Sequence, residues 1–425
     1  MGRERLLWNV ASLDPFFIFF DRMKRLFGFV EKRLIALMLA LLPVWICACA
    51  QKKEIAQAQT YIKSGANLDK AEASMRTLLQ DSANKQNMKI WLTLTEAIKK
   101  QYEQGNEKLY LKQAYDTTAL FLTNRKMFLA YEAMDSVDAL PNKKGSVRPR
   151  FRKKNMDFLV PFRKNLYSGG LFFVSKQKFS EAFSMFDAYI DCTRQPLFSS
   201  MKYSATEPVA LSASYLATYC GVRLHDNRMA EKHSANALLY KSGRENTMRF
   251  LADIYNEEKR TGEYRDILQK GVEEYPKSEY FFTRLVDYYN SNNMQDSAMA
   301  VADKAIEGDS LNTLFLYAKG NILLNIGEYE KCIEVCDHII AINDSVADAY
   351  YTAGVAYLNL AFEAQKNGGK GSKAHAKDAY SKALPYMEHY RQLAPDQKDR
   401  WAAALYNIYL NLNMGKKFEE ISKLL

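Results

Sequence analysis

The sequence predicts an all-α fold built from antiparallel helix pairs, and three observations lead to that prediction. The 425-residue chain contains only 10 Pro and 19 Gly, which favours long helices over a β-rich architecture. Hydrophobic residues make up 48% of the chain and aromatic residues 13%, a composition typical of a well-buried fold and not of a disordered one. Leu316 and Gly320 are followed 34 residues later by Tyr350 and Gly354, so one structural unit recurs.

The recurring unit has the pattern of a helix, a turn and a second helix. Apolar and small side chains lie at helical spacing before Gly327, which marks the turn, and Cys332, Cys336 and Ile339 mark one face of the second helix. A 34-residue period with small and aromatic residues at these offsets resembles the tetratricopeptide repeat (TPR). The resemblance implies a TPR superhelix, an α-solenoid in which each antiparallel helix pair covers the apolar face of the next. It also implies a protein-interaction scaffold.

The repeat pattern divides the chain into five parts. It fits residues 163–425 closely and 52–135 more loosely, and Leu140–Gly145 interrupts it with turn residues. Near the C-terminus, Asn367–Lys373 lengthens one turn. We therefore predict an N-terminal extension at 1–22, a signal peptide at 23–50, TPR-like repeats at 51–140, a basic linker at 141–160, and a TPR array at 161–425 with an insertion near 362–376.

The N-terminus has the pattern of a secretory signal. Lys32 and Arg33 precede a short apolar run, Leu34–Ile46, and small residues follow it. A membrane span needs about 20 apolar residues, so a retained anchor is the less favoured alternative. Residues 1–33 precede this apolar run, and a signal peptide rarely carries so many residues before its apolar core. We therefore expect the true start of the protein at Met23.

Two processing routes are open after the apolar run. Ala48-Cys49-Ala50 satisfies the A-x-A rule for cleavage before Gln51. Ile46-Cys47-Ala48-Cys49 resembles a bacterial lipobox, although Cys47 stands where Ser, Thr or Ala is usual. We favour lipidation at Cys49. That resemblance implies an exported envelope lipoprotein in the periplasm or at the outer membrane, with a lipid anchor.

Charge gives little support to a nucleic-acid function. The net charge of +10 is spread along the chain, and the one basic stretch, Arg148–Lys154, lacks the aromatic alternation that base stacking needs. We interpret this stretch as a solvated loop and first helical turn. Contact with anionic lipids or an acidic partner is the alternative.

The residues that could carry catalysis or bind metal have structural explanations. Cys332 and Cys336 share one helical face, but they occupy packing positions, and a zinc site would need two further ligands. A disulfide is the alternative for this pair. The loop Gly368–Lys373 lacks the phosphate-binding G-x-x-x-x-G-K-[ST] pattern, and we interpret it as a flexible insertion. The five histidines form no cluster at metal or triad spacing. We therefore expect that the protein is not an enzyme and has no catalytic residue, metal ion or cofactor.

The TPR resemblance assigns binding residues to the first helix of each repeat. Such arrays usually bind on the concave side, through positions 5, 9 and 12 of each repeat. Tyr317 precedes Asn321 where chaperone-binding repeats place a lysine, so the carboxylate clamp is absent. The residues assigned to binding are Arg249, Asp253, Asn256, Asp287, Asn290, Tyr317, Asn321 and Tyr351.

These features predict a non-catalytic scaffold of the cell envelope that binds a protein or peptide partner in its concave groove, as an adaptor or assembly factor. The alternative is an envelope lipoprotein that captures a glycan or other ligand beside an outer-membrane transporter. The 27 Tyr and 23 Phe favour that alternative, but most of them lie at packing positions. Self-association of the chain is a further possibility that the sequence leaves open.

Overall fold

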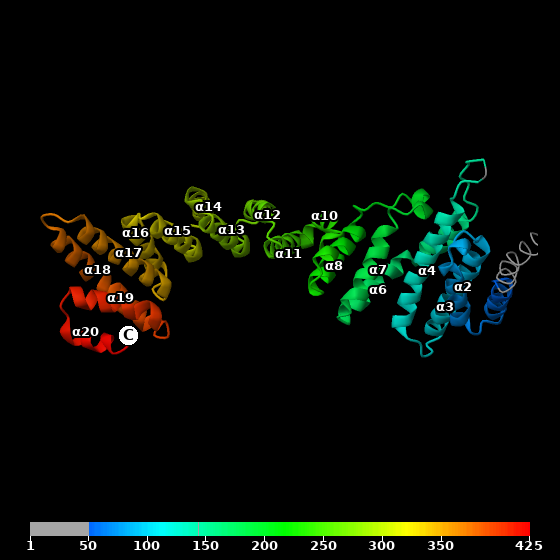
Figure 1. Cartoon of the computed structure of the whole chain (residues 1–425), viewed down its shortest axis with the longest axis horizontal. Coiled ribbons are helices and arrows are strands. Elements are labelled where there is room, and N and C mark those ends of the chain that lie inside the picture. The colour runs from blue at the N-terminus through cyan, green and yellow to red at the C-terminus, as the bar shows by residue number, and fades with distance from the viewer. Residues whose placement is uncertain (1–50, 143) are drawn as a thin grey trace, which may run out of the picture. The chain divides into compact units, whose positions relative to one another are not determined.

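The computed structural model describes residues 51–142 and 144–425, and every regular element in these ranges is a helix. Two compact units make up the chain, Met1–Cys220 and Gly221–Leu425. Each unit is a series of antiparallel helix pairs (Figure 1). The predicted all-α TPR fold class is therefore confirmed. The predicted signal peptide, the start at Met23 and the lipidation of Cys49 lie outside the described residues.

The first unit begins with a helical segment at 51–64. Its later α-helices are α2 (Leu68–Gln80), α3 (Met88–Tyr110), α4 (Thr117–Asp138), α5 (Arg152–Leu159), α6 (Arg163–Ser175), α7 (Phe179–Asp191) and α8 (Pro208–Arg223), with the short 3₁₀ helices η1 (Ser82–Asn84), η2 (Val160–Phe162) and η3 (Pro196–Met201) between them.

Local sequence explains where these helices begin. The side chains of Asn87 and Asp116 accept hydrogen bonds from backbone N–H groups in the first turns of α3 and α4, which caps both helices. α2 follows a turn in which Asn67 has a φ of 55°. Its Ala71 and Met75 are fully buried, as their helical spacing predicts.

The segment predicted as a linker, 141–160, lies inside the first unit and does not separate the two units, whose division falls within the last turn of α8. Side chains of α4 hold this segment in place. Arg152 donates hydrogen bonds from its Nε and Nη2 to both oxygens of the Asp135 carboxylate, and Asp138 accepts one from the Phe151 backbone N–H. The basic stretch is therefore partly used in ion pairs that anchor α5 against α4.

The second unit contains the clearest repeats. Its elements are α9 (Asn227–Glu231), α10 (Ser234–Ala237), η4 (Lys241–Gly243), α11 (Arg244–Glu257), α12 (Thr261–Glu274), α13 (Glu279–Ser291), α14 (Gln295–Gly308), α15 (Thr313–Ile326), α16 (Tyr329–Ile342), α17 (Ala347–Asn367), α18 (Ser372–Leu393), α19 (Lys398–Asn411) and α20 (Gly415–Ser422).

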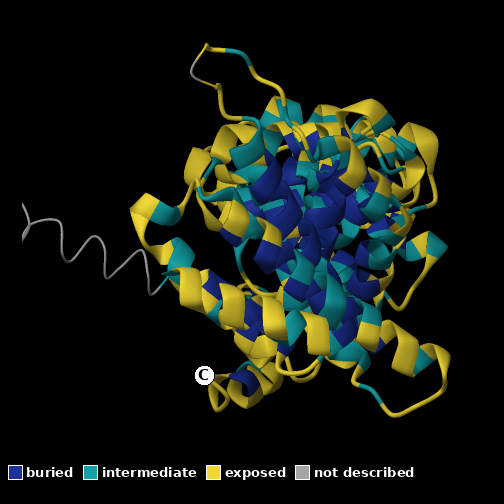
Figure 2. Cartoon of the chain, turned by 90° about the vertical axis from the view of Figure 1, so that its right-hand side faces the viewer, coloured by how far each residue is buried: buried dark blue, intermediate teal, exposed yellow. Residues whose placement is uncertain are grey.

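Close packing within a pair and between successive pairs depends on small residues facing large ones. A Cβ added at Gly271 would lie 2.3 Å from the Phe281 ring, and one added at Gly354 would lie 2.7 Å from the Met387 side chain. Figure 2 shows the buried residues gathered on the helix faces that turn inward, with exposed residues outside them. This is the arrangement that the small and large positions of the repeat predict.

The turns between paired helices repeat as well. Lys259, Asn293 and Gly327 lie 34 residues apart and have φ values of 57°, 56° and 85°. Each residue ends the first helix of its repeat in the left-handed region, where glycine is favoured. The 34-residue period therefore extends to the backbone conformation of the turn.

The predicted insertion near 362–376 is mostly helical. α17 continues to Asn367 and α18 begins at Ser372, so only Gly368–Gly371 lies outside the helices. The glycines suggested a long loop, but the residues on both sides extend the two helices by additional turns. Within 51–142 and 144–425, no helix combines the length and the apolar character needed to cross a membrane.

Candidate functional site

The first helices of the repeats in the second unit form a continuous layer. α13 contacts α15, α15 contacts α17, and α17 contacts α19, in addition to the contacts that each makes with its paired helix. All eight residues assigned to binding lie on helices of this kind, α11 to α17. We call the side of the second unit that carries these residues the first-helix face.

At α11 and α13 the structure brings two of the assigned residues together with two others. The Tyr280 hydroxyl donates a hydrogen bond to Asp253, with the oxygens 2.5 Å apart, and another to the Arg249 carbonyl oxygen at 3.1 Å. The Arg284 guanidinium stacks on the Tyr280 ring, with its Cζ 3.7 Å from the ring centroid. Arg249 and Asp253 are therefore joined through a tyrosine of the next repeat.

Burial and charge shape this group. Burial raises the pKa of Tyr280, and the Asp253 carboxylate raises it further because it accepts the phenolic proton in a hydrogen bond. Partial desolvation by the neighbouring side chains raises the pKa of Asp287 as well, although the residue as a whole is exposed, against the opposing effect of the Arg284 charge. The tyrosine is thus a neutral hydrogen-bond donor at physiological pH.

A cavity of about 700 Å³ lies beside Arg249. The Arg249 Nη2 donates to Glu245 at 2.5 Å and to the Ser278 hydroxyl at 3.2 Å, while its Nε is buried without a hydrogen-bond partner. The cavity is lined by Glu245, Arg249 and the residues 275–280. Arg249 is therefore held at the edge of this cavity through its Nη2, while its Nε is unpaired among the described residues.

Asparagine amides continue the first-helix face. Asn256 and Asn290 occupy the same position of successive repeats, and the Oδ1 of Asn290 is buried without a hydrogen-bond partner. The side chains of Asn256 and Asn321 also make no hydrogen bond with any described residue. Tyr317 and Asn321 are half-buried on α15, whereas Asn256 and Asp287 are exposed. The face therefore carries several amide groups without a hydrogen-bond partner among the described residues.

Tyr351 differs from the other assigned residues because its ring is covered. The Arg400 guanidinium of α19 lies 3.9 Å from the Tyr351 ring centroid, and Arg400 also pairs with Asp348 at 2.8 Å. The Tyr390 ring packs against Tyr351 with the centroids 5.0 Å apart. Tyr351 therefore contributes to packing between repeats more than to an open surface.

Sequence reasoning missed Tyr280, Arg284 and Arg400 as residues of this face. Tyr280 lies at the second position of its repeat, and only positions 5, 9 and 12 were considered. The register that selected Asp287 and Asn290 could have identified Tyr280 too. Arg400 belongs to the repeat after Tyr351, and nothing local in the sequence indicates their contact.

The cysteines of the repeat have the packing role that their positions predict. Cys332 and Cys336 are free thiols with no exposed surface, and they pack with Leu316, Ile339 and Ala353. Among the described residues, no three His, Cys, Asp or Glu side chains gather as metal ligands would.

Comparison with known proteins returns TPR structures. No family model and no curated protein matches the chain. The C-terminal part of a TPR repeat-containing protein from Cytophaga hutchinsonii is 14% identical, with a TM-score of 0.42 over 60% of this chain and 93% of its own. YrrB, described as a TPR protein with an unusual peptide-binding site, is 17% identical, with a TM-score of 0.34 over 46% and 91%. PilF from Pseudomonas aeruginosa is 12% identical, with a TM-score of 0.32 over 65% and 100%.

Proposed function

We propose that the first-helix face of the second unit binds an extended peptide segment of a partner protein. The observation that carries this proposal is the Oδ1 of Asn290, a buried acceptor without a partner, on a face with two other unpaired amides, Asn256 and Asn321. A buried acceptor that lacks a hydrogen bond is costly, and a bound backbone N–H would satisfy it.

The spacing of the face suits an extended chain. Neighbouring packed helices lie about 10 Å apart, and an extended peptide advances about 3.3 Å per residue. Each repeat would therefore span about three peptide residues. Amides recurring once per repeat would bind backbone groups at a regular interval, while the Arg249 cavity would accept a side chain.

The location of this scaffold is part of the same proposal. The basic residues, the apolar run and the small residues before Gln51 support export to a bacterial cell envelope with a lipid on Cys49. Glycan capture, the alternative, would need open aromatic platforms. Tyr280 and Tyr351 instead have arginines stacked on their rings, so we favour peptide binding.

Partner recovery with matched variants tests the proposal. The tagged full chain would be purified from detergent-solubilised native envelope, and bound proteins would be quantified for three chains: the unaltered one, Asn256→Ala with Asn290→Ala, and Asn106→Ala. Asn106 is exposed on α3 in the first unit, so it controls for the chemical change.

We expect the double variant to lose about tenfold in affinity for a stoichiometric partner, because two hydrogen bonds are removed. The Asn106 variant should bind normally. Equal recovery by all three chains would reject the first-helix face as the binding surface. Intact-mass analysis of the same sample would distinguish a lipid on Cys49 from an unmodified Gln51 start.

A further inference from the structure

A second cavity, of about 760 Å³, lies at the α17–α18 turn, where the insertion lengthens the repeat. It is bounded by the end of α17, the loop Gly368–Gly371, the first turns of α18, and Asn411 at the end of α19. Its volume is typical of a small-molecule site. We propose that this cavity binds a small organic molecule through a carboxylate or phosphate group.

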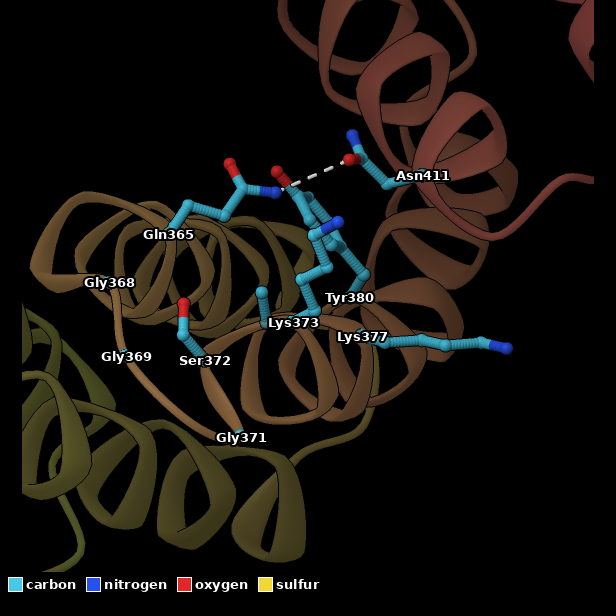
Figure 3. A pocket seen from close by; sticks show the side chains of 10 residues that line it. Gln365, Gly368, Gly369, Gly371, Ser372, Lys373, Lys377, Tyr380 and Asn411 are labelled. Atoms are coloured by element: carbon cyan, nitrogen blue, oxygen red, sulfur yellow. Dashed lines mark hydrogen bonds between the residues drawn. The ribbon is translucent and has the colours of Figure 1, made fainter.

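Four polar side chains from three helices converge on the cavity. Figure 3 shows Lys373 and Tyr380 extending from α18 towards the amides of Gln365 and Asn411, while Lys377 extends away from them. The Gln365 Nε2 donates to the Asn411 Oδ1 at 3.3 Å, which links α17 to α19 across the cavity. The site is therefore assembled from segments 46 residues apart in the sequence.

The Tyr380 hydroxyl is the observation that indicates a ligand. Tyr380 is only 8% exposed, and its ring belongs to the apolar core around Ala376, Ala383 and Met387. Its hydroxyl nevertheless forms no hydrogen bond within the described residues, although the residue lines the cavity. The hydroxyl is not enclosed by protein as the hydroxyl of Tyr390 is, so it opens into the cavity. A molecule in the cavity that carries an acceptor oxygen would accept its hydrogen bond.

Charge specifies the class of ligand. No Asp or Glu lines the cavity, and Lys373 forms no ion pair within the described residues. The ammonium of Lys373 and the hydroxyl of Tyr380 both donate hydrogen bonds, and donors of this kind pair most strongly with anionic oxygens. The lining therefore favours a carboxylate or a phosphate over a cation.

The backbone adds to the same preference. α18 runs for 22 residues from Ser372, so the positive end of its helix dipole lies beside the cavity, although the N–H groups of Ser372 and Ala374 already bond to the carbonyl oxygens of Gly369 and Gly371. The loop reaches this position through Gly368 and Gly371, with φ values of 63° and 99°. The Ser372 hydroxyl donates to the Ala364 carbonyl oxygen at 2.5 Å and closes the loop.

Titration with three related sugars tests the proposal and distinguishes the two anion sources. Glucose, glucuronate and glucose 6-phosphate share a ring and differ in their charged group. Each would be titrated into the full chain by calorimetry at low ionic strength. We expect both anions, or one of them, to bind with a Kd of about 1 mM or tighter and glucose not to bind. A preference between the anions would identify the group that the cavity recognises.

Three variants assign binding to the cavity. Tyr380→Phe removes only the hydroxyl and keeps the ring in the core, and Lys373→Gln removes the charge. Lys370→Gln makes the same charge change in the same loop, at a residue that does not line the cavity. We expect about tenfold weaker binding for the first two variants and less than about twofold for the third.

Three results would overturn the proposal: no binding of either anion up to about 10 mM, Tyr380→Phe binding as the unaltered chain does, or Lys370→Gln weakening binding as much as Lys373→Gln. Circular dichroism would verify that each variant is folded. The double variant Asn256→Ala with Asn290→Ala should leave anion binding unchanged, so this proposal and the peptide proposal can fail separately.

Discussion

Arg400 stacks on Tyr351 from the following repeat, with its Cζ 3.9 Å from the centroid of the tyrosine ring. The arginine also forms an ion pair with Asp348, so one side chain connects α19 to two positions of α17. Contacts of this kind join consecutive first helices. They explain why a residue assigned to peptide binding is instead covered by its neighbour.

Removing this contact should loosen the junction between the last two first helices. Arg400→Met keeps much of the side-chain length but removes the charge, and we expect it to lower the free energy of unfolding by about 1 kcal/mol. Urea unfolding would measure the change, and tetranitromethane should nitrate Tyr351 faster. Arg265→Met is the matched control, because the ion-pair partner of Arg265 within the described residues is the adjacent Asp266 and not a residue of another helix. Equal effects of both variants would contradict a specific role for Arg400.

Glu132 should make the first unit less stable as the pH rises through neutrality. Burial, and to a smaller extent the nearby Asp191 charge, raise the pKa of this carboxyl to about 8, and its Oε1 has no hydrogen-bond partner among the described residues. The folded state therefore keeps a proton that the unfolded state releases near pH 4.5. Stability should fall between about pH 4.5 and 8 and then level off.

Glu132→Gln should remove most of this fall, on the order of 3 kcal/mol in the free energy of unfolding. Urea unfolding at a series of pH values would measure it. Glu334→Gln, an exposed change on α16, is the control. A Glu132→Gln variant that kept the full pH dependence would show that another group causes it.

The left-handed turn residues predict opposite effects of glycine at two equivalent positions. Lys259 has a φ of 57°, which a side chain disfavours, while Gly327 has a φ of 85° at the equivalent position. Lys259→Gly should raise the free energy of unfolding by up to about 1 kcal/mol, and Gly327→Lys should lower it by about 1–2 kcal/mol. Thermal unfolding would measure both. A loss of stability with Lys259→Gly would contradict the argument.

Gly170 should not tolerate even a methyl group. A Cβ at this position would lie 2.4 Å from the Phe186 ring, which is fully buried. We expect Gly170→Ala to cost about 1–3 kcal/mol of unfolding free energy. Gly262→Ala is the control, because nothing lies within 4 Å of its added Cβ, and alanine favours the helix there. Similar effects of both changes in thermal unfolding would reject the packing explanation.

The sequence alone predicted the parts of the fold that depend on local spacing. The 34-residue recurrence of small and large residues identified the helix pairs, and Cys332 and Cys336 are buried as that spacing requires. The glycines at 368–371 gave a misleading signal, because they mark a short turn between two lengthened helices. The break after Leu140 also misled, since Arg152 and Asp135 hold that segment within the first unit.

The candidate sites were less accessible to sequence reasoning. The repeat register placed Arg249, Asp253 and Asn290 on one face, but it could not show that Tyr280 joins the first two or that Arg400 covers Tyr351. These contacts depend on the distances between repeats. The cavity at Tyr380 was also beyond prediction, because Gln365 and Asn411 meet only after α19 packs against the earlier pair.

Because the same turn recurs within one chain, its repeats can be compared with one another to choose stabilising substitutions. Lys259, Asn293 and Gly327 are three natural solutions to one backbone requirement within a single molecule. An internal consensus, drawn from repeats that fold side by side, can therefore guide stabilising substitutions without any alignment of relatives. Where two repeats differ at a turn, the residue better suited to the left-handed conformation is the one to transfer.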